Sequence, residues 1–238
     1  ISSLAWLGIE HDGDEYIQSK NITKHVAIAE ELIKKGFAYE CYCSEEEINE
    51  QKKKCKKQGM PYVYNRKWRD AKDLQIPKDV KPVIRFKNPN KKITFTDLIL
   101  GDIEFDTTEL GDFVIARNIE TPIYHLTVVV DDGLMQVTHI LRGQEHINNT
   151  PRQILILEAL GFDRPEYAHI PLIMSPRGGK LSKRDPEVIP AFEYKGQGIL
   201  APALINFMAF IGWNPGDERE IMSMDELISE FDIEKVQK

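Results

Sequence analysis

Apolar residues recur every three to four positions over residues 23–35, and this spacing predicts an amphipathic helix. Thr23 is the expected N-cap, and Gly36 ends the pattern. Another helix is expected to begin at Thr150-Pro151, because Thr is a good N-cap and proline suits the first helical turn. Further helices are expected over 199–212, from the capping box of Ser44 with Glu47, and from that of Ser223 with Glu226.

Short alternating segments, typical of β-strands, fill residues 82–117. The apolar run from Ile123 to Val130 predicts a longer strand, and Val137 to Leu141 predicts another. Strand–helix alternation after residue 120 favours a parallel layer of α/β type. The expected fold class is therefore α/β, interrupted by a β-rich insert at roughly 41–117.

The composition is that of an ordinary globular protein, with 238 residues of which 42% are hydrophobic and 29% charged. No apolar run is long enough to cross a bilayer, so no membrane partner is expected. Three cysteines, an odd number, argue against disulfides and favour a reducing compartment such as the cytoplasm. Because the formal net charge is −7, a nucleic-acid partner would need a local basic patch. Candidate patches are Lys52 to Lys57, Arg66 to Arg69 and Lys180 to Arg184.

The run Lys180-Leu181-Ser182-Lys183-Arg184 follows two glycines and has the chemistry of a polyphosphate-binding loop. Lysine supplies a mobile point charge and arginine a rigid fork of donors, so together they neutralise negative charge as it develops. Short basic runs are also ordinary solvated surface, and these five residues alone leave both interpretations open. A P-loop is excluded, because Leu181 stands where Ser or Thr must follow the lysine.

The cysteines raise the question of a metal site. Cys41 and Cys43 form a Cys-x-Cys pair, and Cys55 follows on a polar segment. Structural zinc needs four Cys or His ligands, and no second pair follows in residues 56–75. The pattern favours small buried hydrophobic residues over metal ligands.

Polar residues gather near the ends of the two strands expected within residues 121–149. Arg142 directly follows apolar Ile140-Leu141, so its charge lies near the core and needs an anionic partner. Asp131 or Asp132 could supply that charge structurally, and a ligand carboxylate would suit an arginine fork equally well. The full set is Tyr124, His125, Arg142, Glu145 and His146.

Residues 122–184 carry five motifs in a specific order. They are Pro-Ile-Tyr-His-Leu, Val-Val-Val-Asp-Asp, Leu-Arg-Gly-Gln-Glu-His-Ile-Asn-Asn, Tyr-Ala-His-Ile-Pro-Leu-Ile and Lys-Leu-Ser-Lys-Arg. This series resembles glutamyl-tRNA synthetase, a class I aminoacyl-tRNA synthetase, and softer similarity covers nearly the whole chain. The resemblance implies a Rossmann-like parallel nucleotide-binding sheet, here incomplete. It divides the chain into part of the catalytic domain (1–40), an inserted α+β acceptor-stem domain (41–117), the second half of the catalytic domain (118–193) and the start of a helical stem-contact domain (194–238).

The resemblance also implies a role for each motif. The basic loop corresponds to the class I Lys-Met-Ser-Lys-Ser signature, so Lys183, and secondarily Lys180, would stabilise the α-phosphate transition state and the leaving pyrophosphate. Tyr124 and Arg142 would bind the side-chain carboxylate of glutamate. The implied partners are ATP with Mg²⁺, glutamate and the tRNA acceptor stem, whose phosphates Lys67 and Arg69 would contact. The ATP-binding set would be Lys180, Ser182, Lys183, Arg184, Leu172, Ile173 through its backbone on adenine, and Glu145 near the ribose.

The chain departs from the family pattern in three places. The His-Ile-Gly-His signature does not occur, so we expect it before residue 1 and expect these 238 residues alone not to activate glutamate. Trp68 and Asp70 stand where some relatives place further zinc ligands, so no zinc is expected. Asp185-Pro186 follows the basic loop where His-Gly is frequent, which would alter how the loop closes. An anticodon-binding region is expected beyond the last helix.

Two other functions stay open at this point. One is a synthetase relative that acts on glutamine or on a modified tRNA base, although the run from Gln144 to Asn149 favours the glutamyl branch. The other is a non-catalytic RNA-binding paralogue, against which the intact basic loop argues, because a mere binder needs no such loop.

Overall fold

The computed structural model describes residues 2–71, 74–78, 80–175, 178–181 and 188–237. The strands are β1 (Ala38–Cys41), β2 (Val83–Phe86), β3 (Lys92–Asp97), β4 (Gly101–Asp106), β5 (Val114–Ala116), β6 (His139–Gly143) and β7 (Glu166–Ile170). The α-helices are α1 (Ser2–Trp6), α2 (Ile22–Lys34), α3 (Glu45–Lys57), α4 (Tyr124–Leu134), α5 (Thr150–Leu160), α6 (Ala191–Gly196), α7 (Ala201–Ala209) and α8 (Met224–Glu230). Short 3₁₀ helices cover Gln18–Asn21, Thr107–Leu110, Gln144–Asn149 and Ile233–Lys235.

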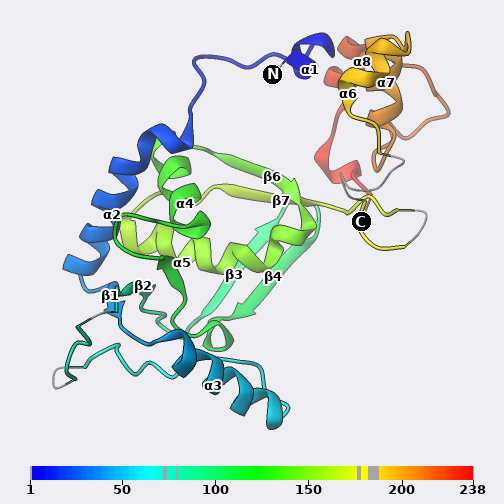
Figure 1. Ribbon diagram of the computed structural model, residues 1–238. Coiled ribbons are helices and arrows are strands. Elements are labelled where there is room, and N and C mark those ends of the chain that lie inside the picture. Colours follow the sequence, from blue (N-terminus) through cyan, green and yellow to red (C-terminus); the bar gives the residue numbers. More distant parts are fainter. Residues whose placement is uncertain (1, 72–73, 79, 176–177, 182–187, 238) are drawn as a thin grey trace.

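Two sheets organise the molecule, as Figure 1 shows. The sheet β1-β2-β5 is antiparallel, and the second sheet has the order β4-β3-β7-β6. Strands β6 and β7 run parallel, with Ile140 opposite Tyr167, and α5 lies between them in the chain. This confirms the α/β class and the parallel layer after residue 120. Strand β3 joins β7 in parallel through Asp97 and Tyr167, so a strand from the predicted β-rich segment extends this layer.

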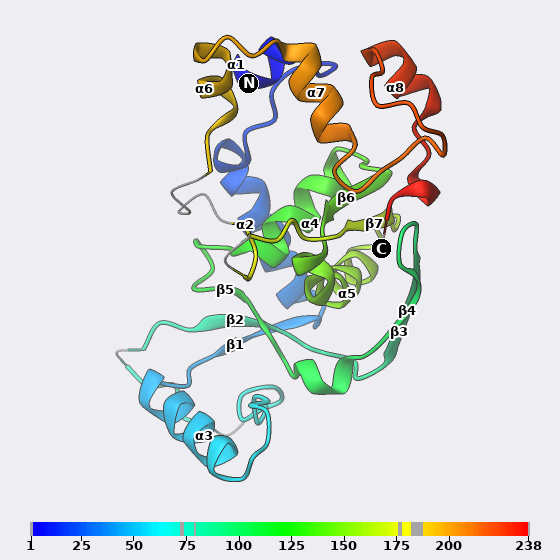
Figure 2. The ribbon, with the colours of Figure 1, turned by 90° about the vertical axis from the view of Figure 1, so that its right-hand side faces the viewer.

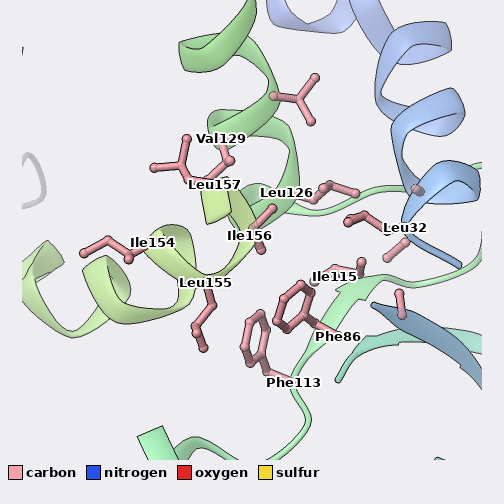
Figure 3. Packing of buried hydrophobic residues seen from close by; sticks show 14 of the residues in the cluster. Leu32, Phe86, Phe113, Ile115, Leu126, Val129, Ile154, Leu155, Ile156 and Leu157 are labelled. Carbon is pink, nitrogen blue, oxygen red and sulfur yellow. The ribbon is translucent and has the colours of Figure 1, made fainter. Parts of the chain in front are cut away.

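The main hydrophobic core lies between helices α2, α4 and α5 and strands of both sheets (Figure 3). Leu32, Leu126 and Ile154 come from the three helices and are fully buried, and the Phe86 and Phe113 rings stack 5.2 Å apart between centroids. Burial on this scale is the main stabilising term of the fold. The same core holds segments from the beginning, the middle and the later part of the chain.

The strand predicted over Ile123 to Val130 is wrong, because these residues form most of helix α4. The run is rich in β-branched valine, which favours strands. However, Leu126, Val129 and Val130 lie three and four positions apart and are all buried. They therefore pack on one helical face toward α2 and α5, and this tertiary packing overrides the local propensity.

The helix ends show which capping signals were reliable. Both capping boxes are present, with Ser44 and Ser223 accepting hydrogen bonds from the backbone of Glu47 and Glu226. Thr23 is not an N-cap, because α2 begins at Ile22. Thr150 is not one either, because it is itself the first residue of α5 and its hydroxyl bonds elsewhere. Serine caps with a reciprocal glutamate therefore located helix ends better than single threonines did.

Helices α7 and α8 form a separate small unit around Trp213, Met222 and Leu227. The helix expected over 199–212 is shorter than predicted and spans α7 only. Figures 1 and 2 place this unit and α3 at opposite ends of the molecule. None of the helices in the described part of the chain combines the length and the apolar character needed to span a bilayer.

Candidate active site

Arg142 lies near the end of strand β6, and its charged group is held by neutral neighbours. Its Nε donates to His169 Nε2 over 3.2 Å, and its Nη2 donates to the Thr150 hydroxyl over 2.9 Å. The guanidinium also lies 5.8 Å from the centre of the Tyr167 ring. Burial lowers the pKa of Arg142, and nearby Tyr124 acts against that shift. The side chain is thus oriented by its hydrogen bonds without being neutralised by them.

The two aspartates considered as structural partners for Arg142 behave differently. Asp131 is bound to other groups: its carboxylate bonds His25 Nε2 at 2.6 Å and accepts hydrogen bonds from Tyr16 and Gln18. Asp132 does interact electrostatically with Arg142, but burial raises its pKa to about 6, despite the opposing effect of the guanidinium. Asp131 is therefore excluded as the main counterion, whereas Asp132 acts on Arg142 electrostatically without a hydrogen bond or ion pair to it.

Tyr124 is the first residue of α4 and is nearly half exposed. Its ring lies 5.5 Å from that of His125 and 6.2 Å from that of His146, measured between centroids. Burial lowers the pKa of His125 to about 4, and the Arg152 and Arg142 charges add to this effect. The structure thus brings Tyr124, Arg142 and His146 to one edge of the sheet, although Tyr124 comes from a helix rather than from the predicted strand.

Lys180 and Glu145 form an ion pair, although 35 residues separate them in the sequence. The lysine is half exposed, and its positive charge lowers the pKa of the Glu145 carboxyl. A Cβ at Gly143 would lie 2.1 Å from Glu145 Oε2, so a larger residue there would displace the flexible end of the Glu145 side chain. The predicted site residues Ser182, Lys183 and Arg184 lie outside the described residues.

Leu172 and Ile173 lie just after β7, at the start of the turn that carries Lys180. Met174 forms an antiparallel bridge with Lys180, and the Ile173 carbonyl accepts a hydrogen bond from Leu181 N over 2.9 Å. The Ile173 side chain is 53% exposed. One lone pair of that carbonyl is therefore engaged within the turn, and the oxygen can accept a second hydrogen bond.

Cys41, the last residue of β1, and Cys43 pack in a small cluster with Tyr39 and Tyr64. Cys41 and Cys43 both lie against the Tyr64 hydroxyl, with sulfur–oxygen distances of 3.3 and 3.5 Å. Trp68 packs against the same cluster, and Asp70 pairs with Lys87. Among the described residues, no group of three or more His, Cys, Asp or Glu side chains is placed to hold a metal ion.

The basic patch at Arg66 to Arg69 is already engaged within the protein. Lys67 pairs with Glu47 of α3, and Arg69 Nη1 donates to the buried Asp112 carboxylate over 3.1 Å. By contrast, the lysines from Lys52 to Lys57 on α3 are all exposed.

Three residues around Arg142 were missed as site residues from the sequence: Asp97, Thr150 and His169. His169 lies within a motif that carried the resemblance, and its signal was a histidine between apolar neighbours in a short strand. Thr150 had been interpreted as a helix cap. Asp97 lies 72 positions before His169 and offered no local signal.

The protein-family model described as "tRNA synthetases class I (E and Q), catalytic domain" matches residues 1–238, so the chain is a class I synthetase catalytic domain. Within that class, the chain belongs to the family of the glutamate and glutamine enzymes, for which the letters E and Q stand.

The chain is 47% identical over 239 residues to a glutamate–tRNA ligase of Pelagibacter ubique, and the match covers 100% of this chain and 51% of that protein. It is 42% identical to the glutamate–tRNA ligase of Sulfurihydrogenibium, again over about half of the relative. Among solved structures, a glutamate tRNA ligase from Elizabethkingia meningosepticum, in complex with its amino acid, superposes with a TM-score of 0.84 at 32% identity. That match covers 100% of this chain and 55% of the other.

Proposed function

We propose that this chain is the part of a glutamate–tRNA ligase that binds glutamate and ATP, and that the complete enzyme activates glutamate and transfers it to the 3′ end of tRNA. The observation that carries the proposal is the Arg142 guanidinium, whose hydrogen-bond partners His169 and Thr150 are both neutral. A half-buried positive charge without a bonded carboxylate favours an anionic ligand. The family match and the names of the similar ligases support the same activity.

Arg142 and Tyr124 are the proposed ligands of the glutamate side-chain carboxylate. An arginine fork matches a carboxylate in shape and charge. Glutamine would present a neutral amide to the same group and leave the Arg142 charge unpaired, so the site is proposed to favour glutamate.

ATP is proposed to lie along the turn that carries the basic loop. The Ile173 backbone would bind adenine beside Leu172, and Glu145 would lie near the ribose. Lys180, Ser182, Lys183 and Arg184 would surround the phosphates, and Lys183 with Lys180 would stabilise negative charge in the transition state. Since Lys180 pairs with Glu145, nucleotide binding would exchange the carboxylate for phosphate as the lysine's partner. Mg²⁺ would enter on the ATP phosphates, its usual way of binding in such sites.

The segment 41–117 is proposed to bind the tRNA acceptor stem, and 194–238 to begin the helical domain that continues the tRNA contact. Because Lys67 and Arg69 pair within the protein, the exposed lysines at the end of α3 are the better candidates for phosphate contacts. Such contacts would weaken steeply as salt concentration rises. The cysteine count and a role in translation support a cytoplasmic location.

The test is pyrophosphate exchange by the full-length protein, with glutamate and with glutamine, each in the presence and absence of tRNA. We expect exchange with glutamate and much less with glutamine. Equal exchange with both amino acids would contradict the assignment of Arg142, and no exchange with either would favour a non-catalytic RNA-binding protein. Lys180→Gln serves as a second probe, because it should raise the KM for ATP and leave that for glutamate unchanged.

A further inference from the structure

Asp97 is a buried carboxylate that organises the junction between β3 and β7. Its Oδ1 accepts hydrogen bonds from the backbone N–H groups of Ile99, Leu100 and His169, at 3.1, 2.9 and 3.2 Å. Its Oδ2 bonds His169 Nδ1 at 2.6 Å, and both side chains are fully buried. The aspartate therefore fixes the backbone and the imidazole of His169 together.

The geometry determines which nitrogen of His169 carries the proton. An arginine Nε can only donate, so His169 Nε2 must accept the hydrogen bond from Arg142. The proton then lies on Nδ1, which donates to Asp97. Burial lowers the pKa of His169, against the opposing effect of Asp97, and this keeps the imidazole neutral. Both hydrogen bonds therefore have the same direction: Arg142 donates to His169, and His169 donates to Asp97.

We propose that Asp97 and His169 are positioning residues for substrate binding: the buried pair fixes the guanidinium of Arg142 so that Nη1 faces the glutamate carboxylate. This inference rests on the proposed function of Arg142. Its Nε and Nη2 are bonded to His169 and Thr150 inside the protein, so two of its three nitrogens are already fixed. Arginine has a long side chain with much rotamer freedom, and fixing it before the ligand arrives removes an entropic cost from binding.

The arrangement makes glutamate binding sensitive to acid. A protonated His169 has no lone pair for Arg142 and places a second positive charge beside it. The charged and titratable groups around the imidazole come from every neighbouring element: Asp97 from β3, Arg142 from β6, Tyr167 from β7 and His146 from the turn before α5. Asp132 and Tyr124 of α4 also interact with Arg142. The KM for glutamate should therefore rise as pH falls through the His169 titration.

Two variants of His169 in the full-length enzyme separate its two hydrogen bonds. His169→Asn places an amide nitrogen near the position of Nδ1, so the bond to Asp97 is kept while the side chain is too short for Arg142. His169→Gln places an amide oxygen near the position of Nε2, where it can accept a hydrogen bond from Arg142.

In pyrophosphate exchange with tRNA present, we expect His169→Asn to raise the KM for glutamate about tenfold, the effect of losing one hydrogen bond to a charged group. Its kcat and KM for ATP should change little, and its KM for glutamate should lose the acid dependence of the wild type. His169→Gln should restore most of the binding.

Arg142→Lys distinguishes failure of this inference from failure of the proposed function. If Arg142→Lys leaves the KM for glutamate unchanged, the proposed role of Arg142 in binding glutamate is wrong. If Arg142→Lys raises that KM but His169→Asn does not, or raises the KM for ATP equally, only the positioning role is wrong. In the double variant, His169→Asn should add little to Arg142→Lys, because the Nε donor is already gone. Should the variants fail to fold, nitrogen NMR of wild-type His169 decides: a proton on Nδ1 at pH 7 is expected, and a proton on Nε2 would overturn the proposal.

Discussion

Two buried aspartates, one associated with each sheet, are stabilised in different ways. Asp112, which lies two residues before β5, has a fully buried side chain that accepts hydrogen bonds from Tyr39, Arg69 and the backbone of Asn88 at 2.9 to 3.1 Å. Asp97 is equally buried, but its side-chain partner is the neutral His169. The Asp112 carboxylate is bonded directly to a permanently charged arginine. The Asp97 carboxylate is bonded to the His169 imidazole, which in turn is bonded to Arg142.

The difference indicates the role of each cluster. The first cluster is Asp112 with Tyr39, Arg69 and Asn88, and the second is Asp97 with His169 and Arg142. Arg69 is bound to Asp112 and to the carbonyl of Asn88, so the charge is balanced inside the protein and joins the segments around β2 and β5. Arg142 has no such bonded carboxylate among the described residues, and the charge that it keeps is available to a ligand. Changes in the first cluster should therefore alter stability alone, whereas changes in the second should alter stability and glutamate binding together.

The largest stability effect is expected for Asp112→Ala. Removing this carboxylate leaves Arg69 without its buried counterion, which should lower the free energy of unfolding by about 3 kcal/mol. Urea denaturation of the full-length protein measures the change. Asp70→Ala is the matched control, because Asp70 also lies near Arg69 but its side chain is 77% exposed, and it should change stability little. A raised KM for glutamate in folded Asp112→Ala would contradict the separation of the two clusters.

Asp97→Asn should have a smaller effect on stability, about 2 kcal/mol, because the amide oxygen can still accept the backbone hydrogen bonds. Unlike Asp112→Ala, it should also raise the KM for glutamate several-fold, because His169 loses its fixed acceptor. Urea denaturation measures the change in the free energy of unfolding, and pyrophosphate exchange on the same preparation measures the KM for glutamate. A loss of stability with unchanged glutamate binding would make Asp97 purely structural.

The stability contributed by the cluster of Asp97, His169 and Arg142 should depend on pH, because His169 is a titratable group. Because the pKa of His169 is lowered in the folded protein, the unfolded chain binds a proton that the folded chain does not. Stability should therefore be full above the unfolded histidine pKa of about 6.5 and fall as pH drops below it. Comparing the pH dependence of unfolding in wild type and His169→Asn isolates this contribution, since His125 is common to both proteins. Identical pH dependence in the two would show that His169 is not held neutral by the fold.

The smallest effect is expected for an exposed carboxylate. Glu158 pairs with Lys91 at 2.6 Å and Arg164 at 3.0 Å, yet all three side chains are more than one third exposed. Solvent screens such pairs, so Glu158→Gln should lower the free energy of unfolding by less than about 1 kcal/mol. The loss should shrink further at high salt in urea denaturation. A loss as large as that of Asp112→Ala would mean that burial does not govern these ion pairs.

Local signals in the sequence predicted local features. The capping boxes at Ser44 and Ser223, the β-rich segment 82–117 and the parallel layer after residue 120 are confirmed, because each depends on neighbouring residues or on simple alternation. The strand at Ile123 was wrong, because packing on α2 and α5 overrides valine propensity.

The residues that hold Arg142 in place could not be predicted from local signals. The open question about Arg142, structural partner or ligand, could not be decided from sequence, since the answer depends on contacts with Thr150 and His169 that only the fold creates. Asp97 reaches His169 across 72 positions and has no periodicity or motif to mark it. The predicted roles of Tyr124, Arg142, Glu145 and Lys180 remain proposals, to which the structure adds their neighbours.

The central claim is that the charge of Arg142, to which no carboxylate among the described residues is hydrogen-bonded, selects glutamate. Arg142→Gln tests it most directly when kcat/KM is measured for glutamate and for glutamine by pyrophosphate exchange in the full-length enzyme. Loss of a charged, forked contact to the carboxylate should lower kcat/KM for glutamate about a hundredfold and change that for glutamine little, so the preference for glutamate collapses. A preference that stays as in the wild type would contradict the account.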